Sequence, residues 1–208
     1  MRKLLEYGGL AAGVVLIAFG IGALWMSFDA RGTVSDELKR EQIVGSPDMS
    51  PAGIQEGIDE AGLTVSAPSC DVADQPIETG GDARCFSQYM RIHALESSGG
   101  LTYAQMGRYL AADDPENPAG TSDETAALTD EEGNPVPNQA RNTWVTETAL
   151  STALNLSYMA EQLALFGIVV GIALVLSGVG FLVLALGGAL RHSAATETPG
   201  AEKAAVAA

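Results

Sequence analysis

Two long stretches without a charged residue, Gly8–Phe28 and Leu163–Leu190, constrain this chain more than any other feature. An α-helix rises about 1.5 Å per residue, so each stretch is long enough to cross the roughly 30 Å hydrocarbon core of a bilayer. The residues between them are polar and acidic. The sequence therefore predicts a mainly α-helical membrane hairpin, in which transmembrane helices at 8–28 and 163–190 flank a single insert at 29–162.

The charges beside these stretches predict the orientation of the hairpin. Arg2 and Lys3 precede the first stretch, and Arg191 follows the second. Basic residues in short flanking segments are held on the cytoplasmic side of a membrane. We therefore expect cytoplasmic termini at 1–7 and 191–208, the second of them disordered, and an extracytoplasmic insert. Arg outnumbers Lys, and Ala and Gly are abundant; this is typical of a high-GC bacterium and predicts a bacterial plasma membrane.

The first stretch has a second interpretation, a cleaved signal peptide. Its apolar run is longer than the roughly 7–15 residues of a signal-peptide core, and Trp25–Ala30 lacks a small-x-small cleavage site, so we expect an uncleaved anchor. Small-xxx-small spacing lets helices approach closely in lipid, and it predicts that the two spans pack through Gly9, Gly13, Gly167 and Gly171. The alternative is that glycine is simply common in membrane helices.

The insert is strongly acidic, with 23 acidic and 7 basic residues from Asp29 to Gln162. This charge repels nucleic acid, so no nucleic-acid partner is expected. Cys70 and Cys85 are predicted to form a structural disulfide, because thiols oxidise outside the cytoplasm. Closing a loop of this length is worth about 3 kcal/mol in the chain-entropy model. The alternatives are a redox pair or a metal site with His93, but the spacing matches no common motif for either.

Helical patterns continue beyond both apolar stretches. Thr33–Ile43 is polar but rich in helix formers, and a stalk helix at 141–162 leads into the second span. Ser50, followed by a proline, predicts the start of a short helix that buries Ile54 and Ile58. The insert is therefore expected to be small, α-rich and attached through long juxtamembrane helices.

The middle of the insert holds its strongest soluble helix. Ala83–Ser98 has an apolar stripe, is preceded by Asp82 as a cap, and is stopped by two glycines. A second short helix is expected after the cap Thr102. The following segment, 111–138, is rich in acidic residues, Pro and Gly, and is predicted to be a mobile loop without EF-hand spacing.

The insert offers little for catalysis. Its single histidine, His93, is too few for a two-His-one-carboxylate iron site or a three-His zinc site. The chain also has no nucleophile elbow, His-Glu-x-x-His motif or phosphate-binding glycine loop. We predict no catalytic residue, no metal site and no cofactor. The candidate ligand pocket is a group of ring side chains at Tyr89, His93 and Tyr103.

Three segments carry a resemblance to a known family: Arg91-Ile-His-Ala-Leu-Glu, Gly99-Gly-Leu-Thr-Tyr-Ala-Gln-Met and Arg141-Asn-Thr-Trp-Val-Thr-Glu-Thr-Ala-Leu. In these segments the chain resembles small, uncharacterised membrane proteins of actinobacteria with two transmembrane helices. The resemblance covers most of the chain, but it implies no activity and no functional residue. Some members of that family carry an aromatic ring-opening dioxygenase label. The single histidine of the insert argues against such chemistry.

These features favour a non-catalytic membrane protein over an enzyme. We expect an accessory or scaffold subunit of a membrane or cell-envelope complex, whose partners are the lipid bilayer and either another protein or further copies of itself. The alternative is an extracytoplasmic sensor or ligand-binding module that uses the pocket around His93. An enzyme is the third hypothesis.

Overall fold

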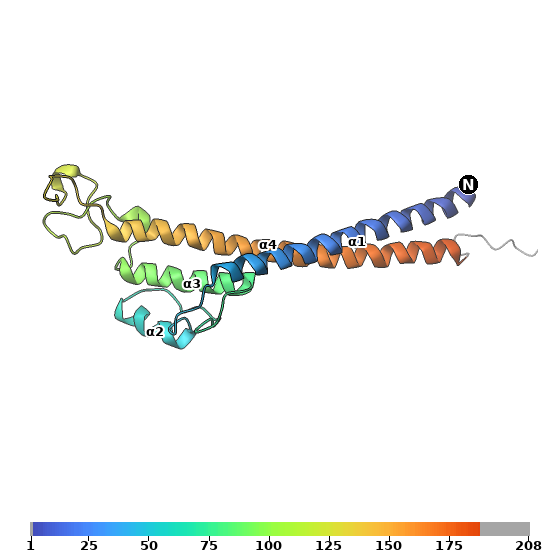
Figure 1. Cartoon of the computed structure of the whole chain (residues 1–208), viewed down its shortest axis with the longest axis horizontal. Coiled ribbons are helices and arrows are strands. Elements are labelled where there is room, and N and C mark those ends of the chain that lie inside the picture. The colour runs from blue at the N-terminus through green and yellow to red at the C-terminus, as the bar shows by residue number, and fades with distance from the viewer. Residues whose placement is uncertain (1, 188–208) are drawn as a thin grey trace, which may run out of the picture. The chain divides into compact units, whose positions relative to one another are not determined.

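The chain folds mainly into α-helices, as predicted (Figure 1). The computed structural model describes residues 2–187; the predicted tail at 191–208 and the last three residues of the predicted second span lie outside them. The helices are α1 (Arg2–Glu41), α2 (Pro51–Glu60), α3 (Gly80–Ser97) and α4 (Gln139–Leu186), with 3₁₀ turns at Tyr103–Gln105 and Glu124–Ala126. Residues 2–187 contain isolated β-bridges but no strand. Two compact units result: one holds the described residues up to Met26 and from Phe166 onward, and the other is Ser27–Leu165.

In the first unit, α1 and α4 pack through glycines that repeat every seven residues. A Cβ added at Gly13 would lie 2.8 Å from the Gly178 carbonyl oxygen, and one added at Gly20 would lie 2.8 Å from that of Gly171. The two helices are therefore antiparallel here. A seven-residue repeat belongs to left-handed helix pairs, whereas the predicted four-residue spacing is typical of right-handed ones. Gly9 is buried and Gly167 half-buried, so their predicted contact role stays a prediction.

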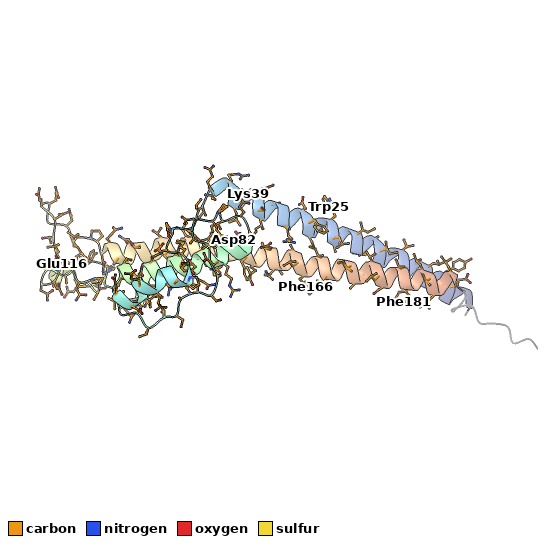
Figure 2. The ribbon with its side chains drawn as sticks, turned by 90° about the horizontal axis from the view of Figure 1, so that it is seen from below. Trp25, Lys39, Asp82, Glu116, Phe166 and Phe181 are labelled. Atoms are coloured by element: carbon orange, nitrogen blue, oxygen red, sulfur yellow. A yellow bond between two sulfur atoms is a disulfide. The ribbon has the colours of Figure 1, made fainter. Side chains whose placement is uncertain are left out.

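Both helices of the first unit keep their apolar side chains on the outside. In the most apolar window of each helix, only 17% of the residues are buried within the chain. Figure 2 shows Trp25, Phe166 and Phe181 on this part of the chain, and Trp25 is 69% exposed. The core helix of a water-soluble protein would be mostly buried. The chain thus has two helices that are long and apolar enough to cross a membrane.

In the second unit, α3 lies alongside α4 in the antiparallel direction (Figure 1). At the start of α3, a Cβ added to Gly80 would lie 2.8 Å from the Ser157 carbonyl oxygen. Further along α3, the Arg91 guanidinium lies 3.4 Å from the Glu147 carboxylate. Residue numbers therefore rise along α3 as they fall along α4. This pair forms the frame on which the remaining segments of the unit pack.

Short polar sequences set where α2 and α3 begin. The Ser50 side chain accepts a hydrogen bond from the Gly53 amide, and Pro51 is the first helical residue, as predicted. The helix α3 begins three residues earlier than expected. Its cap is Thr79, whose hydroxyl accepts from the Asp82 amide while the Asp82 carboxylate accepts from the Thr79 amide. Asp82 thus completes a reciprocal capping box instead of acting as the cap itself.

The main core of the second unit joins α1, α2, α3 and the disulfide loop. Ile54 and Ile58 of α2 are buried, as predicted, in a cluster that includes Leu38 of α1 and Leu154 of α4. Cys70 and Cys85 form the predicted disulfide. Beside it, the fully buried Tyr89 donates its hydroxyl hydrogen to the Cys70 carbonyl oxygen, at 2.6 Å. The disulfide loop is therefore attached to α3 by a covalent bond and a hydrogen bond.

The segment after α3 differs from the prediction in one way. The expected second short helix is only the 3₁₀ turn Tyr103–Gln105. The acidic segment 111–138 folds back on itself. Isolated antiparallel bridges pair Ala111 with Ala127 and Thr129 with Pro135. Figure 2 labels Glu116, which lies in this segment. Whether the segment moves in solution stays a prediction.

Candidate functional site

The second unit has a groove between α3 and α4. Its volume is about 1040 Å³, and the extended segment 65–69 forms its third wall. At Gly80, near one end of the groove's α3 wall, α3 approaches α4 so closely that an added Cβ would lie 2.8 Å from the Ser157 carbonyl oxygen. Three segments distant in sequence thus line one surface depression.

Exposed apolar side chains line part of this groove. Leu156 and Met159 lie one turn apart on α4, and each is 59% exposed. Val65, from the extended segment, is 38% exposed. Water-soluble surfaces carry single exposed apolar residues commonly, but several together mark an interaction site. Here they adjoin hydroxyl and amide side chains such as Thr152 and Asn155, which line the same groove.

The opposite wall, on α3, carries two arginines in an otherwise acidic insert. The Arg84 guanidinium lies 4.6 Å from the ring centre of Tyr158, an arrangement in which the aromatic face attracts the cation. Within residues 2–187, no carboxylate lies within ion-pairing distance of Arg84. This guanidinium is therefore able to meet a carboxylate from outside the chain.

The second arginine is held in place by its neighbours. Arg91 lies between the Trp144 ring, 3.7 Å from its guanidinium, and the Glu147 carboxylate, 3.4 Å away. Glu147 is only 5% exposed and also accepts hydrogen bonds from the Ser151 and Thr148 hydroxyls, at 2.7 and 3.3 Å. A buried carboxylate requires such partners, because desolvation without them is costly. Arg91 and Glu147, held by these contacts, line the groove.

The three residues predicted to form a ligand pocket do not line this groove. Tyr89 is part of the core, and burial together with the negative charge of Asp71 raises the pKa of its phenol above 10.0. His93 lies at ion-pairing distance from two carboxylates, with Nδ1 2.8 Å from Glu96 and Nε2 3.3 Å from Asp48. The third residue, Tyr103, lies under the guanidinium of an arginine of α4, 4.1 Å from its ring centre.

Acidic side chains in the segment 111–138 accept hydrogen bonds from backbone amides close to them in sequence. Asp123 accepts hydrogen bonds from the Thr125 hydroxyl and amide, which hold the pKa of this carboxyl below its usual range. Asp130 accepts in the same way from the amides of Glu132 and Asn134. Across residues 2–187, no group of three or more His, Cys, Asp or Glu side chains is arranged to hold a metal ion.

The groove itself was not predicted from the sequence. The apolar positions of α4 were visible as a helical pattern, but nothing in that pattern says which of them α3 covers. The residues next to Glu147 and Arg84 in the sequence do not indicate that these two side chains line a groove. Their partners, Arg91 and Tyr158, lie more than fifty positions away. A stretch free of charged residues, from Thr148 to Ala160, was the one hint of a contact surface on α4.

Comparisons with known proteins do not place this chain in a family. No protein-family model, no curated protein and no solved structure matches it.

Proposed function

We propose that this protein is a membrane-anchored, non-catalytic accessory or scaffold subunit that docks another protein in the groove between α3 and α4. The observation that carries the proposal is the pair of exposed apolar side chains at Leu156 and Met159, which lie in one groove with polar side chains and two arginines. Exposed apolar clusters of this kind are costly in water and are characteristic of interaction sites.

The proposal places the protein in the plasma membrane of a bacterium. Its support is the length and exposure of the two apolar helices, and the disulfide, which forms in oxidising compartments. Basic residues at Arg2 and Lys3 favour cytoplasmic termini and an extracytoplasmic insert. The docking groove would then face the cell envelope.

The walls of the groove define the chemistry of the partner. One wall offers apolar contact at Leu156 and Met159, and the other offers the unpaired guanidinium of Arg84. A helix with an apolar stripe and a carboxylate beside it would satisfy both walls. Charge complementarity of this kind fixes orientation and increases the rate of association.

A photo-crosslinking side chain at position 156 tests the proposal in native membranes. We expect one protein to be linked in stoichiometric amount from Leu156, and not from Leu150, which is on the same helix, is 49% exposed and lies outside the groove. Leu156→Glu should then weaken co-purification of that protein at least about tenfold, because the contact would bury an unpaired charge. Leu150→Glu is the matched control and should leave it unchanged.

Two results of this experiment count against the proposal. If the cross-links join only copies of this chain, the groove mediates self-assembly and does not dock a different protein. Equal labelling from Leu156 and Leu150 would show that the groove is not the docking surface. The predicted ligand-sensor alternative gains no support from the geometry, since Tyr89, His93 and Tyr103 line neither the groove nor the smaller cavity described below.

A further inference from the structure

A second, smaller cavity lies between α1, α4 and the residues that precede α3. Its volume is about 310 Å³, and its polar lining includes Arg31, Glu78, Glu161 and Ser35. Arg31 donates a hydrogen bond from Nη2 to Glu161 Oε1, at 3.1 Å. The side chains of Arg31 and Glu78 are 41% and 46% exposed, whereas that of Glu161 is 14% exposed. The cavity is thus open at one side and charged within.

This cavity lies beside the ends of both apolar stretches. Arg31 follows Phe28, the last residue of the first stretch, by three positions, which is about 4.5 Å along a helix. On α4, Glu161 precedes Leu163, the first residue of the second stretch, by about 3 Å. The headgroup layer on each side of a bilayer is roughly 5–8 Å thick. If the two stretches span the membrane, the cavity lies at headgroup depth.

The charges of the cavity select among lipid headgroups. A guanidinium has five N–H donors, and Arg31 uses one of them on Glu161, so others can bind a phosphate together with the Ser35 hydroxyl. The carboxylates of Glu78 and Glu161 accept hydrogen bonds from a primary ammonium. A choline headgroup has no N–H to donate, and a purely anionic headgroup leaves both carboxylates opposite negative charge.

We propose that this cavity binds a phosphoethanolamine headgroup, with the phosphate on Arg31 and Ser35 and the ammonium on Glu78 and Glu161. Its source is the phosphatidylethanolamine of the outer leaflet. The inference rests on the membrane placement proposed above. Such a lipid would link α1 to α4 through both of its charges and stabilise the base of the insert.

The test uses the full-length protein in nanodiscs made of phosphatidylcholine alone, or of phosphatidylcholine mixed with phosphatidylethanolamine or phosphatidylglycerol of matched chains. Lipids that remain bound are counted by native mass spectrometry, and the melting temperature is recorded. We expect phosphatidylethanolamine to be enriched roughly tenfold over the other two lipids and to raise the melting temperature, as one charge-assisted hydrogen bond would do. Soluble phosphoethanolamine in a separate arm should have little effect.

Glu78→Gln is the informative variant, because Glu78 is half-exposed and its described ion pair, with Lys39, is long at 3.7 Å. It should abolish the enrichment and leave the melting temperature in phosphatidylcholine unchanged. Glu60→Gln, at an exposed position of α2 outside the cavity, is the control. Arg31→Gln should also abolish the enrichment, but it removes the Arg31–Glu161 pair and is expected to lower stability in every lipid.

Several outcomes would overturn this proposal. Equal retention of all three lipids would mean ordinary annular lipid, and a preference for phosphatidylglycerol would contradict the role of the carboxylates. An equal effect of soluble phosphoethanolamine would reject the membrane as the source. If the protein does not enter nanodiscs at all, the membrane placement itself fails; if it enters without selecting a lipid, only the inference about this cavity fails.

Discussion

Asn138 holds the acidic segment to the start of α4. Its Nδ2 donates to the carbonyl oxygens of Pro118 and Gly107, at 2.8 and 3.2 Å, and its Oδ1 accepts from the Ala140 amide at 3.1 Å. The side chain is 1% exposed. One residue therefore caps a helix and closes a loop, which makes its contribution to stability larger than that of an ordinary cap.

Replacing this residue should destabilise the second unit. We expect Asn138→Ala to lower the free energy of unfolding by about 3 kcal/mol, because a helix cap and two hydrogen bonds to half-buried residues are lost. Chemical denaturation of the detergent-solubilised protein measures this. Asn142→Ala, at an exposed position one turn further along α4, is the control and should change little. Equal effects of the two substitutions would show that the hydrogen bonds of the Asn138 side chain add no stability beyond that of an ordinary exposed asparagine.

Tyr89 makes stability depend on pH on the alkaline side. Its folded-state pKa is raised above 10.0 by burial and by Asp71, so the unfolded chain releases the phenol proton at a lower pH than the folded chain does. The contribution of the protonated Tyr89 phenol to folding stability is fully present below pH 10.0. It is lost as the pH rises through the higher folded-state pKa. Tyr89→Phe should lose about 1 kcal/mol at neutral pH, from the hydrogen bond to Cys70.

The check is urea denaturation at a series of pH values from about 8 to 11. In the unsubstituted protein, stability should fall above pH 10.0, and Tyr89→Phe should reduce the steepness of this fall. Tyr109→Phe, which removes a hydroxyl that bonds the exposed Glu124, should leave the alkaline slope as it is. An unchanged slope in Tyr89→Phe would assign the alkaline loss to other groups.

At the scale of elements, the pairing of α1 with α4 depends on backbone contact at glycines. A Cβ at Gly20 would meet the Val175 side chain at 2.7 Å and the Gly171 carbonyl oxygen at 2.8 Å, whereas one at Gly22 would meet nothing within 4 Å. Because backbone cannot move aside as a flexible side chain does, the helices must separate to admit any side chain at Gly20.

Gly20→Leu should therefore destabilise the helix pair by about 2 kcal/mol, as overpacking typically does. Gly22→Leu, on the same helix and facing away, should be tolerated. The melting temperature in detergent micelles distinguishes them. If both variants melt together, the glycine contacts do not hold the pair.

The local sequence was sufficient to predict some elements of the fold and not others. The long apolar runs, the Ser50–Pro51 start of α2 and the Cys70–Cys85 pairing were predictable, because each depends on neighbouring residues or on a unique pair. The start of α3 was misplaced because Thr79 and Asp82 cap it reciprocally, and both residue types are good caps alone.

The candidate site was largely unpredictable for a different reason. Helical spacing identifies apolar positions on α4, but Leu154 is buried in the main core and Leu156 is exposed, and only the packed structure shows which is which. Likewise, the Asn138 side chain donates hydrogen bonds to carbonyl oxygens twenty and thirty-one residues away in the sequence, and no local pattern predicts such partners. Seven-residue glycine spacing was present in the sequence, but it competed with the shorter spacing of Gly9 and Gly13.

At the scale of the whole molecule, the two units differ in the chemistry of their surfaces. The first presents an apolar exterior that water would not solvate, and the second carries most of the acidic residues and the groove with the exposed Leu156 and Met159. The central claim is that the first unit lies in the membrane and that the second lies outside the cytoplasm.

Thiol labelling of intact cells tests this placement most directly. The native cysteines are joined in a disulfide, so single cysteines at Glu116 of the acidic segment and at Ser193 of the predicted cytoplasmic tail provide the only free thiols. The account predicts that a membrane-impermeant maleimide labels Glu116→Cys in intact cells, and Ser193→Cys only after permeabilisation. Labelling of Glu116→Cys that also needs permeabilisation would contradict it.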